Sequence, residues 1–156
     1  MNGMNLNEET NRLPLDQLLR LVVGACYEVS NVLGSGFLEK VYERALCEEL
    51  ALRGVRVESQ VPISVSYKGK VVGEYICDIL VDGRLIVELK CCEKLADEHV
   101  AQCINYLYAT GMTMLLLVNF QNPHIEWRRI VPRRGNSVRE EPATYEAIPV
   151  HPVHPG

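Results

Sequence analysis

The sequence predicts an α/β fold in which helices flank a mixed central β-sheet. Two segments with helical spacing of apolar residues open the chain, and a third lies between segments that look like strands. Several of those strand-like segments are apolar on both faces, as central strands are. The elements follow in the order α-α-β-β-β-β-α-β-β, which is typical of helices packed on a mixed sheet.

The first two predicted helices are bounded by proline and glycine. The first helix starts at Pro14, which suits an opening turn, and runs to Leu33. Gly34-Ser35-Gly36 interrupts the pattern. The second helix covers residues 37–53, and Gly54 ends it.

Sequence patterns typical of β-strands begin at Val55 and continue, with one helical interruption, to Val131. The predicted strands are Val55–Gln60, Ile63–Tyr67, Val71–Val81, Arg84–Cys92, Met112–Phe120 and Ile125–Val131. Lys68-Gly69 and Asp82-Gly83 are the turns between consecutive strands. The last of these strands is weakly apolar and is expected at an edge of the sheet. Residues 96–110 form the third helix, which Gly111 ends.

One domain is predicted over residues 13–131, between a flexible N-terminus (1–12) and a mostly disordered or extended tail (132–156). The tail is rich in Pro, Gly, Glu and Arg and has too few apolar residues for a core. His151 and His154 are expected to be ordinary residues of that tail rather than metal ligands. The six cysteines form no C-x-x-C pair, which favours reduced thiols over disulfides or a metal cluster.

Charge and hydropathy narrow the function classes. The net charge of -4 counts against broad electrostatic binding of duplex nucleic acid. A late basic run is interpreted first as a solvated surface and second as a phosphate contact; it comprises Arg128, Arg129, Arg133, Arg134 and Arg139. Because no apolar run reaches the ~18 residues of a membrane span and no signal peptide is recognisable, a cytoplasmic protein is expected.

Asp78, Glu88 and Lys90 are charged residues that stand beside or within the apolar stretches Tyr75–Val81 and Leu85–Leu89 of the predicted strands. Glu88 and Lys90 are two apart and therefore share a face of one strand. Asp78 joins that face only if the intervening loop has an odd number of residues, such as Val81-Asp82-Gly83. The hypothesis of a shared site thus predicts a three-residue loop.

Two neighbouring carboxylates repel unless a cation lies between them, and Mg²⁺ prefers carboxylate and water oxygens. Such a metal polarises a phosphoryl oxygen and activates bound water, and a lysine can orient that water. The set Asp78, Glu88 and Lys90 therefore suits phosphodiester hydrolysis. A structural ion pair between Lys90 and one of the carboxylates remains the alternative.

Several ordered blocks of the chain resemble a known family. Gly36-Phe37-Leu38-Glu39-Lys40-Val41-Tyr42 resembles the signature of the GxxExxY proteins, a bacterial group assigned to the PD-(D/E)XK nuclease superfamily. The later blocks are Gln60-Val61-Pro62-Ile63, Ile86-Val87-Glu88-Leu89-Lys90, His99-Val100-Ala101-Gln102, Tyr106-Leu107 and Val118-Asn119-Phe120. The likeness runs from about Leu15 to Val131.

The resemblance implies a restriction-endonuclease-like core and a role for each site residue. It implies that Asp78 and Glu88 bind Mg²⁺ or Mn²⁺ and that Lys90 is the catalytic lysine. It also implies that Glu39 joins the site. Gln102 and Tyr106, four apart on one helix face, would contact the substrate phosphate or the lysine. The proline that names the superfamily is replaced by Cys77, and His99 is a weaker candidate, because a histidine packed at a helix start is more common.

The function expected from these features is metal-dependent hydrolysis of phosphodiester bonds in DNA or RNA. The alternative is a catalytically silent module of nuclease fold that binds or assembles, for example as a homodimer. A third option, a phosphoesterase acting on small molecules, lacks the Gly-rich phosphate cradle that would support it.

Overall fold

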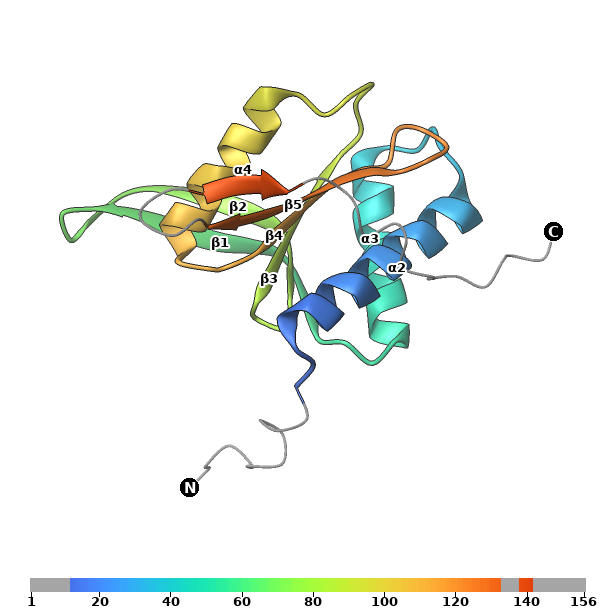
Figure 1. Cartoon of the computed structure of the whole chain (residues 1–156), viewed down its shortest axis with the longest axis horizontal. Helices are drawn as coiled ribbons and strands as arrows, with labels where there is room; N and C mark the ends of the chain where they lie inside the picture. Colours follow the sequence, from blue (N-terminus) through green and yellow to red (C-terminus); the bar gives the residue numbers. More distant parts are fainter. Residues whose placement is uncertain (1–11, 133–137, 142–156) are drawn as a thin grey trace.

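The computed structural model describes residues 12–132 and 138–141 (Figure 1). The described elements are α2 (Leu15–Leu33), α3 (Glu39–Leu52), β1 (Val57–Tyr67), β2 (Lys70–Val81), β3 (Leu85–Lys90), α4 (Asp97–Thr110), β4 (Leu115–Asn119), β5 (Glu126–Pro132) and β6 (Val138–Glu141). The predicted helices are confirmed to within a few residues at their ends.

The six strands form one mixed sheet in the order β1-β2-β3-β4-β5-β6. β3 and β4 are parallel and every other neighbouring pair is antiparallel. A parallel pair needs a crossover connection, and α4 supplies it between β3 and β4. The predicted α/β class with a mixed central sheet is confirmed.

Helices cover both faces of the sheet (Figure 1). α2 and α3 pack on one face in a core that includes Val22, Leu46 and Trp127. α4 packs on the other face, where Cys103 and Leu107 meet residues of the central strands. The strands between the two cores are therefore buried on both sides, which explains their unbroken apolar sequence.

The two strands predicted at Val55–Gln60 and Ile63–Tyr67 are one strand, β1. Pro62 does not interrupt it because β1 is an edge strand, where a missing backbone donor is tolerated. Gln60 has a φ of 54°, which is unusual for a residue other than glycine. The boundary predicted between Gln60 and Ile63 is therefore wrong, although the backbone at Gln60 is irregular.

The prediction that Ile125–Val131 lies at an edge of the sheet is wrong, because β6 pairs with β5 from the outside. β6 belongs to the segment 132–156, and the sequence gives little sign of it since it is short and highly charged. Residues 133–137 and 142–156, with His151 and His154, lie outside the described residues, as do residues 1–11.

The β2–β3 connection has the odd length that a shared site requires. Val81 pairs with Leu85, so the loop is Asp82-Gly83-Arg84, one residue later than the predicted three. Asp82 and Gly83 have φ values of 52° and 68°, and the Arg84 N–H donates to the Val81 carbonyl at 3.0 Å. Glycine is favoured at such a left-handed position because it has no Cβ.

All six cysteines are free, and three of them are fully buried. Reduced thiols remain the prediction. Among the described helices, none has the length and apolar character needed to span a membrane.

Candidate active site at the fork between two strands

Asp78 and Glu88 lie where β2 and β3 separate. Ile79–Val81 of β2 pair with Leu85–Val87 of β3. The same register, continued by one residue, places Asp78 opposite Glu88. At this point two backbone N–H groups face side-chain carboxylates rather than carbonyl groups of the opposite strand. The Leu89 N–H donates to Asp78 Oδ2 at 2.9 Å, and the Asp78 N–H lies 3.4 Å from Glu88 Oε1. The fork therefore holds both carboxylates in place through the backbone of the opposite strand.

Glu88 is a buried acid, with 6% of its surface exposed. Burial, together with the negative charge of Asp78, raises the pKa of Glu88 to about 8. The positive charge of Lys90 and the bond from the Asp78 N–H act in the opposite direction. The pair of the buried Glu88 and the half-buried Asp78 has only one lysine beside it, and a divalent cation would supply the missing positive charge.

Lys90 and Glu39 approach the pair from two elements. Lys90 is the last residue of β3, two positions after Glu88, and Glu39 is the first residue of α3. Partial desolvation and the charge of Asp78 raise the pKa of Glu39, while Lys90 and the Cys91 N–H lower it. The first residue of α3 thus carries a carboxylate within electrostatic range of Asp78 and Lys90.

α4 brings Tyr106 to the same region. The Tyr106 ring is half-buried, and burial followed by the negative charge of Glu88 raises the pKa of Tyr106 to about 12. Gln102 lies one turn earlier on α4 and is exposed. The predicted Tyr106 thus lies within the electrostatic range of Glu88, and Gln102 faces solvent beside it.

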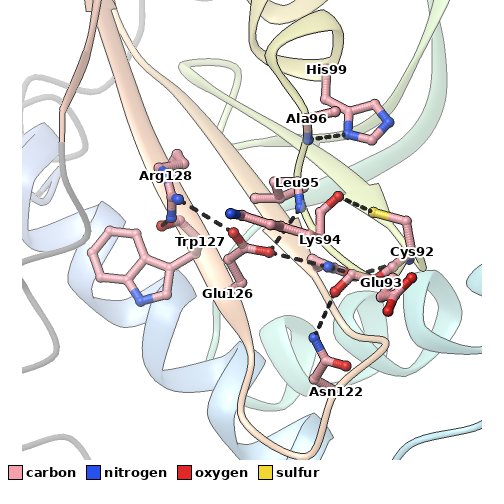
Figure 2. A network of polar contacts seen from close by, with 11 residues as sticks. Cys92, Glu93, Lys94, Leu95, Ala96, His99, Asn122, Glu126, Trp127 and Arg128 are labelled. Carbon is pink, nitrogen blue, oxygen red and sulfur yellow. Dashed lines mark hydrogen bonds and ion pairs between the residues drawn. The ribbon is translucent and has the colours of Figure 1, made fainter.

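The loop after Lys90 is fixed by a polar network (Figure 2). Buried Asn119 accepts the Cys92 N–H at 3.1 Å and donates to the Cys92 carbonyl at 2.8 Å. Glu126 accepts the Leu95 N–H at 3.0 Å. Because these bonds hold the loop between β3 and α4, they fix the end of the strand that carries Lys90.

His99 belongs to this network as a helix cap. Its Nδ1 accepts the backbone N–H of Ala96 at 3.0 Å, at the start of α4 (Figure 2). The structural interpretation of His99 is therefore preferred over a catalytic one.

Tyr42 fixes the glycine-rich loop that precedes Glu39. Its hydroxyl donates to the Gly34 carbonyl at 2.7 Å and lies 3.2 Å from the Phe37 N–H. The buried ring stacks on Phe120, with centroids 4.9 Å apart. Gly36, at a φ of 108°, lets the loop turn sharply between these contacts. Tyr42 is thus a structural residue of the motif that it shares with Glu39.

Replacing Tyr42 by phenylalanine is expected to lower the free energy of unfolding by about 1–2 kcal/mol, because the Gly34 and Phe37 backbone groups lose their partner. Urea denaturation followed by circular dichroism measures the loss. The exposed Tyr67, changed in the same way, is the control and should stay within about 0.5 kcal/mol of wild type. Equal stability of the two variants would contradict the assignment.

Glu43 and Gln60 are parts of this region that the sequence analysis missed. Glu43 lies one turn after Glu39 on α3 and is 5% exposed. Gln60 Nε2 donates to Glu43 Oε1 at 2.7 Å, and Lys40 Nζ lies 3.0 Å from Oε2. The spacing of four between Glu39 and Glu43 was the available signal.

Gln60 lies beside Asp78 in the sheet. Ser59 pairs with Ile79 and Val61 pairs with Cys77, so Gln60 stands opposite Asp78 across the β1–β2 ladder. A left-handed backbone conformation costs free energy in a residue other than glycine, and it persists where surrounding contacts stabilise it. The hydrogen bond from Gln60 to Glu43 is such a contact.

Two substitutions at Gln60 distinguish the stability that its hydrogen bond to Glu43 provides from the cost of its strained backbone. Gln60→Ala and Gln60→Gly both leave Glu43 Oε1 without its donor, at a cost of about 1–3 kcal/mol. Glycine also relieves the φ of 54°, so the glycine variant is expected to be about 1 kcal/mol more stable than the alanine variant. Urea midpoints at a common slope provide the comparison, and a more stable alanine variant would refute the strain.

The donor set fits a divalent cation with few protein ligands. Asp78 and Glu88 offer adjacent carboxylate oxygens, and Mg²⁺ is commonly bound by one or two carboxylates with water. In the described part of the chain no group of three or more His, Cys, Asp or Glu side chains converges as a metal cluster. The remaining ligands of an ion at this fork would therefore be water or substrate oxygens.

The late basic run is partly neutralised. Arg128 Nη2 lies 3.3 Å from Glu126 Oε2, and Arg129 Nη1 lies 3.4 Å from Asp16 Oδ1. Arg133 and Arg134 lie outside the described residues, and the Arg139 side chain is not described. The two described arginines thus stabilise acidic neighbours.

Comparison with known proteins adds one finding. A family model described as "PD-(D/E)XK nuclease superfamily" matches residues 16–130, which is most of the chain and includes every residue of the fork. No curated protein and no solved structure matches.

Proposed function

Since this chain belongs to the PD-(D/E)XK nuclease superfamily, we propose that it is a metal-dependent nuclease that hydrolyses phosphodiester bonds at the β2–β3 fork. The observation that carries the proposal is that Asp78 and Glu88 lie opposite each other. The carboxylate of Asp78 accepts the Leu89 N–H, and the carboxylate of Glu88 lies against the Asp78 N–H. A structural ion pair would not require two carboxylates so close together.

Asp78 and Glu88 would hold Mg²⁺ or Mn²⁺, which when bound polarises the scissile phosphate and lowers the pKa of water. Lys90 would orient the attacking water and offset the charge that develops on the phosphate oxygens. Glu39 would complete the acidic side of the site. Gln102 and Tyr106 would contact the phosphate from α4, where an exposed amide and a phenol suit phosphate oxygens.

The finer identity rests on sequence motifs. The G-x-x-E-x-x-Y segment of residues 36–42 supports membership of the GxxExxY group. We expect a cytoplasmic protein whose substrate is DNA or RNA, and a homodimer is compatible with this proposal.

The test is cleavage of labelled single- and double-stranded DNA and RNA by the purified full chain. Products should form with Mn²⁺ or Mg²⁺ and disappear with EDTA. Absence of products from every substrate with both metals would overturn the proposal. Mn²⁺ titration by calorimetry then distinguishes the alternative, since a silent binding module of nuclease fold need not bind metal.

A further inference from the structure

A cavity of about 470 Å³ lies between the β1–β2 hairpin and α4. The hairpin contributes Val65, Ser66 and Tyr75, and α4 contributes Asn105, Tyr106, Tyr108 and Ala109. We name this set the tyrosine cavity. Its volume is in the range of pockets that hold small organic ligands, about 300–1,000 Å³.

Three tyrosines line the cavity, namely Tyr75, Tyr106 and the exposed Tyr108, and the first two stack on each other. Tyr75 and Tyr106 stack with centroids 3.6 Å apart and ring planes 5° from parallel. The Tyr75 hydroxyl oxygen is buried and has no hydrogen-bond partner among the described residues. Buried polar atoms of proteins nearly always have a partner, so this hydroxyl lacks a hydrogen bond that a ligand atom reaching it would supply.

The cavity adjoins the carboxylate fork. Tyr75 lies three residues before Asp78 on β2, a distance of about 10 Å along a strand. The negative charge of Glu88 acts on both Tyr75 and Tyr106. The cavity and the carboxylate fork are therefore neighbours.

We propose that the tyrosine cavity binds one unpaired base of a single-stranded nucleic acid whose backbone passes Asp78 and Glu88. The position of that backbone rests on the proposed nuclease function, whereas the binding of a base does not. Every base has a flat face that stacks on an aromatic ring, and bases in a duplex are not free to do so.

Charge and polar groups favour the same ligand. A chain with a net charge of -4 gains little from phosphate attraction, so stacking must supply much of the affinity. The Ser66 hydroxyl, the Asn105 amide and the Tyr75 hydroxyl offer hydrogen bonds to the polar edge of a base. These groups stand beside an apolar wall, which suits a base better than a free phosphate.

Binding is measured without cleavage, using the full chain with Lys90→Met in EDTA. The probes are a fluorescein-labelled thymidine oligomer of about 20 nucleotides, its uridine counterpart and a duplex of the same length, read by anisotropy. Tyr75→Leu is expected to weaken single-strand binding about tenfold and to leave duplex binding unchanged. The RNA and DNA oligomers report which sugar the site prefers.

Two further variants keep the experiment decisive. Tyr67→Leu removes an exposed tyrosine of the same hairpin outside the cavity and should bind as the parent does. Ala109→Phe fills the cavity while leaving its three tyrosines in place and should also weaken single-strand binding about tenfold. Thermal melting confirms that each variant is folded, and Ala109→Phe decides the question if Tyr75→Leu does not fold.

Unchanged single-strand affinity in folded Ala109→Phe and Tyr75→Leu variants would overturn the cavity proposal. If the affinity is unchanged but the wild type cleaves nucleic acid, the cavity proposal fails and the nuclease function is supported. Conversely, cavity-dependent binding without cleavage by the wild type would support the cavity and reject the nuclease function.

Discussion

Replacing Asp78 by asparagine is expected to reduce Mn²⁺-dependent cleavage by at least about 100-fold. The substitution removes one negative charge from the pair that would hold the metal. The asparagine oxygen can still accept the Leu89 N–H, which Asp78 Oδ2 now accepts at 2.9 Å, so the strand fork should survive. Initial rates on the best substrate of the wild type measure the loss.

Asp16→Asn is the matched control for this prediction. Its side chain is 69% exposed on α2, and its ion pair with Arg129 lies outside the fork. The control should cut at the wild-type rate, and circular dichroism should find both variants folded. If Asp78→Asn cut as fast as Asp16→Asn, catalysis would have to be assigned to another site.

The second large effect concerns Glu88 and the stability of the metal-free protein. The pKa of Glu88 is raised to about 8 in the folded chain, against an ordinary value of 4.5. Between these values the folded state binds more protons than the unfolded state, so stability falls as pH rises. The metal-free protein is therefore expected to melt at a lower temperature at pH 8.5 than at pH 5.5, and most of the change should occur below about pH 8.

Glu88→Gln removes the titrating group and should flatten this dependence. The variant is expected to be more stable than the metal-free wild type at pH 8.5 and similar to it at pH 5.5. Saturation with Mn²⁺ should restore the wild type at high pH, by about 2.7 kcal/mol at 100 times the dissociation constant. Differential scanning calorimetry at both pH values measures these shifts. A wild-type pH profile that Glu88→Gln does not alter would contradict the buried, proton-binding role of Glu88.

Much of the fold follows from local patterns in the sequence. The helices were recognisable because their apolar residues recur at helical spacing and glycine ends two of them. The odd β2–β3 loop was predictable from parity, because two residues can share a face of a sheet only in certain registers. β6 could not be predicted, since it is short and highly charged and pairs with β5 from the outside.

The site was predictable to the extent that charge stood out against apolar neighbours. Asp78 and Glu88 interrupt buried strands, and such residues are rarely placed there without a partner. Glu43 and Gln60 gave no comparable signal, because a helix glutamate and a strand glutamine are ordinary surface residues. Their contact depends on the left-handed backbone of Gln60, which sequence does not reveal. The Tyr75–Tyr106 stack joins residues that are 31 positions apart and arises only when α4 packs on the sheet.

The edge position of Pro62 has a consequence for self-association. An exposed edge strand is a template on which a second chain can continue the sheet. Pro62 has no backbone N–H to offer, and Gln60 bends the strand out of regular geometry two residues earlier. An incoming strand would lose hydrogen bonds at both points, so β1 resists edge-to-edge aggregation.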